Sequence, residues 1–124
     1  MGDNGEGGMD YEKLSQLAQA EVHAALSALP RELRARVDAA PVFLEPYPDE
    51  DDIASGIEPD TLGYFDEGSP EAPTPRIRLW LENIWDYADG DVEVFLEEVH
   101  TTLLHEIGHL LGWDEDEVED RGLG

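Results

Sequence analysis

The sequence contains no cysteine among its 124 residues. This absence excludes disulfide bonds, zinc sites built from thiolates and catalysis by a cysteine nucleophile. Any transition metal bound by the chain must therefore be held by histidine nitrogens or by carboxylate oxygens. The apolar content of 40% is ordinary for a globular protein, so we expect one folded domain with a sizeable core.

Basic residues are also scarce. Lys13 is the only lysine and six arginines accompany it, against 31 acidic residues, so the formal net charge is −24. A surface of this sign repels phosphate groups, and we expect neither nucleic acid nor a membrane as a partner. No apolar run approaches the length of a transmembrane helix, and the first ten residues do not resemble a signal peptide. These features favour a cytoplasmic protein.

Hydrophobic spacing and turn residues predict an α+β chain. Residues 1–9 are expected to be a disordered tail, followed by a single domain over residues 10–124. The acidic, proline-containing segment 46–60 is expected to be an exposed loop. The alternation of polar and apolar residues in Arg76–Trp80 is typical of a half-buried strand. In chain order, we expect helices over 10–29 and 30–37, strands over 42–45, 62–66 and 76–80, and helices over 81–87 and 91–111.

The most informative segment is His105–His109, which reads HEIGH. In the predicted last helix, positions four apart lie on one face, so the two imidazoles can bind a single Zn²⁺. Glu106 lies beside the first imidazole, where a carboxylate can accept a proton from a zinc-bound water. On a helical wheel both histidines share a side with Glu98 and Thr102, opposite a broad apolar side. We therefore expect one side of this helix in the core and the other lining a cleft.

Two further histidines are interpreted differently. His100 precedes His105 by five residues and falls on the apolar side of the wheel, so it cannot share the metal in a regular helix. We expect His100 to be buried and hydrogen-bonded. His23, in the first helix, is expected to be a surface residue.

A catalytic zinc usually has three protein ligands, so the two histidines need a third. In an unbroken helix Glu115 would lie about 15 Å along the axis from His105, out of reach. Gly112 can end the helix, because glycine tolerates the left-handed conformation found after a helix C-terminus. Glu115 is then the preferred third ligand and Asp116 the next. An upstream residue is less favoured, as are Asp114, Glu117 and Glu119, of which Asp114 and Glu117 have the spacing of a capping box.

The motif resembles that of the minimal bacterial zincin-like metallopeptidases, HExxHxxGxxD. The residues that match it in order are His105, Glu106, His109, Gly112 and Glu115, the last in place of Asp. The resemblance extends over residues 10–123 and includes PDTLGYF at Pro59–Phe65 and RIRLW at Arg76–Trp80. It implies a compact α+β zincin with a short mixed sheet beside the motif helix. It also places Arg76–Trp80 as an edge strand near the cleft, where it could hold an extended peptide substrate.

These observations predict a zinc metallopeptidase that binds one Zn²⁺ per chain and hydrolyses peptide or protein substrates. His105, His109 and Glu115 are the expected zinc ligands, and Glu106 is the expected general base for a zinc-activated water. The alternative is a zinc-binding protein-interaction module with the same fold and little or no turnover. The presence of Glu106 favours the enzyme, because binding of the metal alone does not need a carboxylate there. Tyr64 and Tyr87 are candidates to steady the oxyanion, although a core aromatic is the preferred interpretation of each.

Overall fold

The computed structural model of the protein describes residues 10–71 and 73–112. The expected N-terminal tail lies outside these residues. Asp10 accepts a hydrogen bond from the backbone N–H of Lys13, and Asp91 accepts from two amides in the same way, so the first residue of each of these two predicted helix ranges caps its helix. The elements are α1 (Tyr11–Ser27), α2 (Arg31–Val37), β1 (Val42–Glu45), α3 (Glu50–Ala54), β2 (Gly63–Asp66), β3 (Arg76–Trp80), α4 (Leu81–Tyr87) and α5 (Val92–Leu110).

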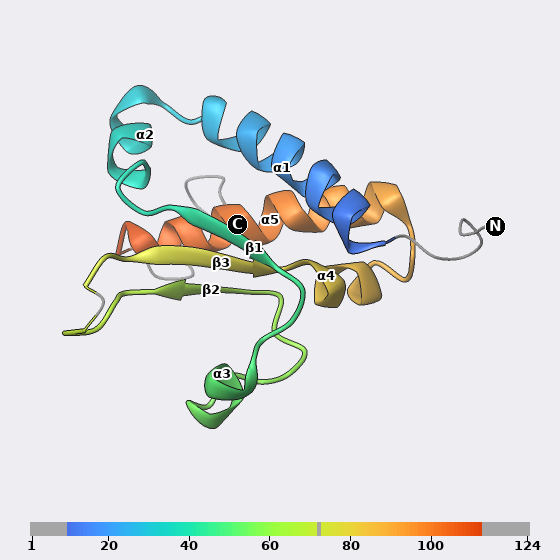
Figure 1. Ribbon diagram of the computed structural model, residues 1–124. Coiled ribbons are helices and arrows are strands. Elements are labelled where there is room, and N and C mark those ends of the chain that lie inside the picture. The colour runs from blue at the N-terminus through green and yellow to red at the C-terminus, as the bar shows by residue number, and fades with distance from the viewer. Residues whose placement is uncertain (1–9, 72, 113–124) are drawn as a thin grey trace.

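The three strands form one mixed sheet in the order β1-β3-β2, with β1 parallel and β2 antiparallel to β3 (Figure 1). The expected α+β fold is confirmed. The placement of Arg76–Trp80 at an edge is wrong, because β3 pairs with a strand on each side. Its residues 77–80 are all buried, whereas β1 and β2 leave Phe43 and Tyr64 about 40% exposed. The most deeply buried strand therefore takes the centre, and β2 becomes an edge.

The core lies between the sheet and the two long helices, α1 and α5, which pack against each other (Figure 1). From β3, Ile77 and Leu79 point into this core and are fully buried. Four apolar residues spaced four apart form the buried stripe of α5, namely Phe95, Val99, Leu103 and Ile107. This spacing keeps the stripe on one face of the helix. It fixes α5 against the sheet, and so fixes the orientation of the motif that α5 carries.

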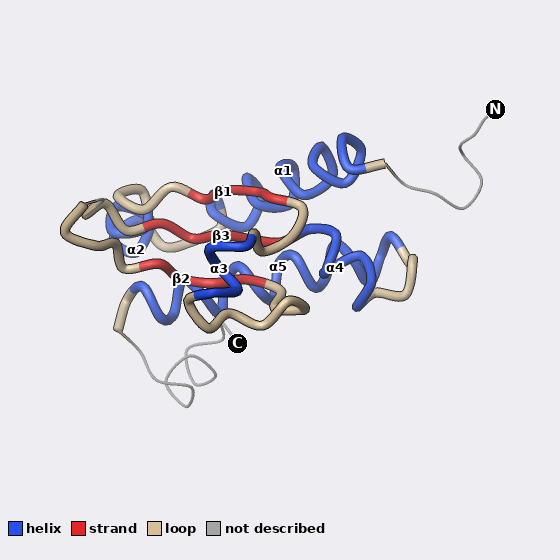
Figure 2. Tube along the Cα trace, turned by 60° about the horizontal axis from the view of Figure 1, so that its bottom comes forward, coloured by secondary structure: helices blue, strands red, loops and turns tan. Residues whose placement is uncertain are grey.

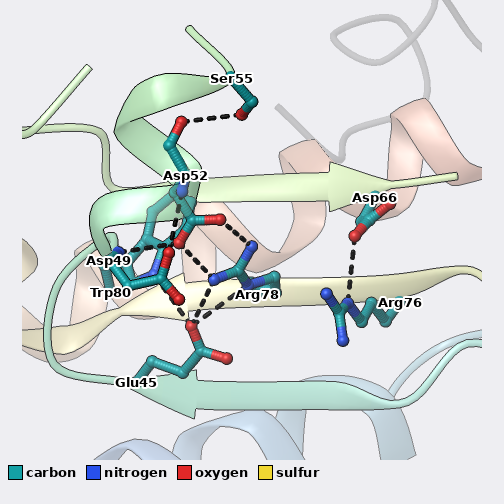
Figure 3. A network of polar contacts seen from close by, with 8 residues as sticks. All are labelled: Glu45, Asp49, Asp52, Ser55, Asp66, Arg76, Arg78 and Trp80. Atoms are coloured by element: carbon teal, nitrogen blue, oxygen red, sulfur yellow. Dashed lines mark hydrogen bonds and ion pairs between the residues drawn. The ribbon is translucent and has the colours of Figure 1, made fainter. Parts of the chain in front are cut away.

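The opposite face of the sheet, which we call the outer face, is covered in part by α3, above Arg78 of β3 (Figure 2). Arg78 of β3 forms a two-pronged contact with Asp52 of α3 at 2.6 Å for each pair of atoms, and its Nη2 donates to Glu45 at 2.8 Å (Figure 3). Asp49 and Asp52 form the capping box that begins α3. Residues 46–60 are therefore more than the exposed loop that their composition suggested, and Asp52 is buried.

Charge pairing explains the difference. Hydrogen bonds from Arg78 hold the pKa of Asp52 below its usual range, and those bonds in turn raise the pKa of Arg78. A buried arginine is tolerated only when it is paired in this way, and Arg78 is 6% exposed. The prediction of a half-buried strand therefore fails at Arg78, because α3 and the Asp52 carboxylate cover the outer face at this position.

The chain between α3 and β2 is held by Asn83 of α4, which is buried. Its Nδ2 donates to the carbonyl oxygens of Pro59 at 2.7 Å and Thr61 at 2.9 Å. These bonds fix the segment that leads into β2. None of the helices in residues 10–71 and 73–112 is long and apolar enough to cross a membrane.

Candidate metal and catalytic site

The HEIGH motif occupies the last part of α5, as its sequence predicted. The helix ends at Leu110, and Gly112 adopts a left-handed conformation with φ of +81°. Its backbone N–H donates to the carbonyl of His109 at 3.0 Å, which closes the final turn. The predicted stop at Gly112 is therefore confirmed.

The two imidazoles of the motif lie close together at the surface end of α5. Their ring centroids are 4.7 Å apart, with an angle of 78° between the ring planes. One zinc ion bound by a nitrogen of each ring at about 2.0–2.1 Å requires a centroid separation of about 5 Å. His105 is half-buried and His109 is exposed, so solvent reaches both side chains. The donor set and its spacing fit one metal ion.

Glu106 points to the same region but is much less accessible, at 9% exposed. It lines two adjacent pockets, one of about 360 Å³ that also includes His109 and one of about 270 Å³ that also includes His105. A carboxylate that shares a pocket with each imidazole and is partly shielded from water suits a role as a proton acceptor.

The two pockets share Gly63 and Glu106 and lie between β2 and α5. We call them together the β2–α5 groove. The cleft expected beside the histidines is therefore present, and one wall of it is the sheet edge. The groove residues are Leu62, Gly63, Tyr64, Phe65 and Glu67 on the β2 side, and Glu98, Thr101, Thr102, His105, Glu106 and His109 on α5.

Gly63 allows β2 to lie directly against the motif helix. A Cβ atom at this position would be 2.6 Å from Cγ2 of Thr102 and 3.0 Å from Cδ2 of Leu79. Thr102, expected on the cleft side of α5, is buried by this contact. Sequence reasoning missed Gly63 as a residue of the site. The available signal was a glycine inside a predicted strand, which often marks a close approach of another element.

Part of the backbone of β2 faces away from the sheet, at the edge that borders the groove. The amide of Trp80 donates to the carbonyl of Leu62 at 2.9 Å, and in an antiparallel pair such bonds recur at every second residue. The N–H and C=O groups of Gly63 and Phe65 therefore point away from β3. In the described part of the chain no strand pairs with this side of β2.

The tyrosine candidates are both exposed, so the interpretation as core aromatics is wrong. Tyr87 is 63% exposed and lies on α4, outside the groove. Tyr64 is 41% exposed and contributes to the groove. Because Gly63 faces α5, strand alternation directs the Tyr64 ring to the outer face, next to Arg78 in register.

The other two histidines lie away from the motif. His100 makes a 3.1 Å contact with Glu21 of α1, which confirms its predicted polar partner. Its side chain is 43% exposed, so the predicted burial is wrong. The contact lies at the rim between α1 and α5, where water still reaches the ring. His23 is exposed, as expected.

The preferred third ligand, Glu115, and the less favoured acids of residues 114–119 lie outside the described residues. Within residues 10–71 and 73–112, no three His, Asp or Glu side chains come together as a possible metal site. The described chain thus supplies two imidazoles as metal ligands, while Glu106 shares a pocket with each of them.

Residues 37–123 match a family model described as zincin-like metallopeptidase. This match covers most of the chain, from the end of α2 through the sheet and α5. The chain belongs to the zincin-like metallopeptidase family. Membership confirms the predicted resemblance and the zincin-like fold, and it supports a zinc-dependent hydrolase. No curated protein matches the sequence of this zincin-like chain.

Proposed function

We propose that this protein is a zinc-dependent metallopeptidase whose active site is the β2–α5 groove. The observation that carries the proposal is the pair of imidazoles with ring centroids 4.7 Å apart, with Glu106 lining the same groove beside the edge strand β2. Family membership supports the same conclusion.

His105 and His109 hold the zinc ion in this proposal. Glu115 is the third ligand, since the helix ends before it and the chain can turn back, with Asp116 and Asp114 as alternatives. When bound, Zn²⁺ supplies Lewis acidity, which lowers the pKa of a coordinated water towards neutrality and polarises a carbonyl group.

Glu106 acts as the general base and then as the general acid. Its carboxylate accepts a proton from the attacking water as the water oxygen bonds to the substrate carbonyl carbon. The same proton then passes to the amine nitrogen as the carbon–nitrogen bond breaks. The position of Glu106 in both pockets supports this role, because it can reach either side of a bond lying across the groove.

The substrate binds as an extended strand along β2. The open N–H and C=O groups of Gly63 and Phe65 provide hydrogen bonds that do not depend on the substrate side chains. This assignment replaces Arg76–Trp80 as the substrate-binding strand, because β3 has no open edge.

The test compares the zinc-loaded wild-type protein with Glu106→Gln, a variant of nearly the same shape. We expect about one zinc per chain in both proteins by elemental analysis. We expect hydrolysis of a peptide library to fall by about 10²- to 10⁴-fold in the variant. Glu97→Gln, which removes the same charge outside the groove, should retain wild-type activity.

Each failure has a distinct meaning. Absence of zinc after loading would show that the protein lacks the proposed zinc site. A Glu106→Gln variant that cleaves as fast as the wild type would show that Glu106 is not the base. Zinc binding without cleavage of any peptide by the wild type would favour the alternative, a zinc-binding interaction module. For the third ligand, Glu115→Ala should weaken zinc binding more than Asp114→Ala or Asp116→Ala.

A further inference from the structure

Both ends of the β2–α5 groove carry a carboxylate besides Glu106. Glu98 lines the pocket that contains His105, and Glu67 lines the pocket that contains His109. The hydroxyl of Thr102 donates to Oε2 of Glu98 at 3.1 Å, which holds that carboxylate in the groove wall. None of the described residues lining the groove is a lysine or an arginine.

The two arginines of the neighbouring strand β3 are already paired elsewhere. Arg78 is bound by Asp52 and Glu45, and Arg76 contacts Asp66 at 3.1 Å, on the outer face of the sheet. Neither guanidinium lines the groove to neutralise Glu67 or Glu98. The described lining of the groove is therefore acidic, and the net charge of −24 has the same sign at longer range.

The spacing along α5 relates these carboxylates to a bound peptide. Glu98 precedes Glu106 by eight residues, which is about 12 Å along a helix. An extended peptide advances about 3.3 Å per residue. A side chain about three or four residues from the bond opposite Glu106 is then level with Glu98. Glu67 lies at the other end of the groove, beyond Phe65.

We propose that the groove selects extended peptides that carry Lys or Arg on both sides of the cleaved bond, within about four residues of it. This inference rests on the proposed function, because it assigns the substrate class of the same site. Glu98 forms an ion pair with the basic side chain on one side of the cleaved bond, and Glu67 forms an ion pair with the basic side chain on the other side. Acidic peptides are excluded by repulsion from both carboxylates and from the surrounding surface.

The test measures binding separately from cleavage. Zinc-loaded Glu106→Gln protein is titrated with fluorescent peptides of about ten residues, long enough to span the groove. The peptides share one apolar centre and carry two lysines, two serines or two glutamates on its flanks. We expect the lysine peptide to bind most tightly and the glutamate peptide most weakly, with the difference shrinking as salt is added.

A matched pair of substitutions separates the groove from the overall charge. Glu98→Gln removes one negative charge in the groove and keeps an oxygen to accept from Thr102, whereas Glu97→Gln removes the same charge in a different pocket, beside His100. Glu98→Gln and Glu67→Gln should each lower the preference for lysine over serine by about twofold to fivefold. Glu97→Gln should leave it unchanged.

Equal binding of the lysine and serine peptides would overturn the inference. An equal loss of the preference for lysine in Glu97→Gln and Glu98→Gln would also overturn it. The proposed function is tested separately, by measuring cleavage of the three peptides by the wild-type protein. If the wild-type protein cleaves all three peptides with the same kcat/KM, the proposed hydrolysis is supported and the proposed specificity is wrong. If the wild-type protein cleaves none of the peptides but Glu98→Gln still selectively reduces binding of the lysine peptide, the proposed specificity is supported and the proposed hydrolysis is wrong.

Discussion

On the face of the sheet towards α5, β3 contributes Ile77 and Leu79, which are fully buried among apolar side chains. On the outer face the same strand contributes Arg78, equally hidden from water but held by Asp52 and Glu45. The five residues of β3 therefore take part in two kinds of packing, one on each face of the sheet. The inner face depends on removal of apolar surface from water, and the outer face depends on charge pairing.

The two faces support different parts of the candidate site. The inner face fixes α5, and with it His105, Glu106 and His109. The outer face fixes α3 to the sheet and therefore the chain that leads into β2, together with the bonds from Asn83. The groove lies where these two parts meet, so damage to either face should change it in a different way.

The largest expected effect comes from the outer face. Arg78→Met leaves Asp52 and Glu45 without their shared cation, and loss of one partner from a buried ion pair costs about 3 to 5 kcal/mol. Arg76→Met is the matched control on the same strand, because the Arg76 side chain is 41% exposed and its pair with Asp66 should contribute less than about 1 kcal/mol. Urea unfolding measures both. Equal losses would mean that burial does not distinguish the two arginines.

The inner face should respond nearly as strongly but without dependence on charge. Leu103→Ala removes a fully buried side chain from the stripe of α5 and should lower the free energy of unfolding by about 3 kcal/mol. The loss should be the same at low and high salt, because no charge is involved. A loss that shrinks markedly on addition of salt would contradict the assignment of purely apolar packing to this face.

The pH dependence separates the faces further. Hydrogen bonds from Arg78 lower the pKa of Asp52 in the folded protein, so its stabilisation is present above the pKa of an unfolded Asp, about 4, and is lost as pH falls through the lower folded value. Asp52→Asn should therefore cost about 2 kcal/mol at neutral pH. The difference between the wild type and Asp52→Asn should shrink below about pH 4, while the cost of Leu103→Ala stays constant. Comparing differences removes the shared effect of the many other carboxylates.

Most elements of the fold could be predicted because they rest on local signals. The caps at Asp10 and Asp91, the stripe of α5 and the stop at Gly112 are each encoded within a few residues. The partner of Arg78 could not be predicted in this way. Asp52 lies 26 residues earlier in a segment of similar acids, and only the tertiary fold selects it.

The site follows the same division. The spacing of His105 and His109 is local, so their shared face could be predicted from the motif. The strand that borders them could not, because the resemblance placed Arg76–Trp80 at the edge, whereas β2 takes that position. The central strand of the sheet is the one that is buried on both faces. The burial of β3 on its outer face involves the contact between Arg78 and Asp52, which the sequence did not predict.

The smallest expected effect tests the contact where the two regions meet. Gly63→Ala places a Cβ within 2.6 Å of Cγ2 of Thr102, whose branched side chain has little freedom to move on a helix. The strand must then shift from α5, at a cost of about 1 to 2 kcal/mol in unfolding free energy and with a change in the groove. Thr102→Ser removes Cγ2 but keeps the hydroxyl that donates to Glu98. The double variant Gly63→Ala/Thr102→Ser should therefore be more stable than the sum of the two single losses predicts, by double-mutant analysis of urea unfolding. Strict additivity would mean that the two positions do not touch, and that the groove wall is set by something other than Gly63.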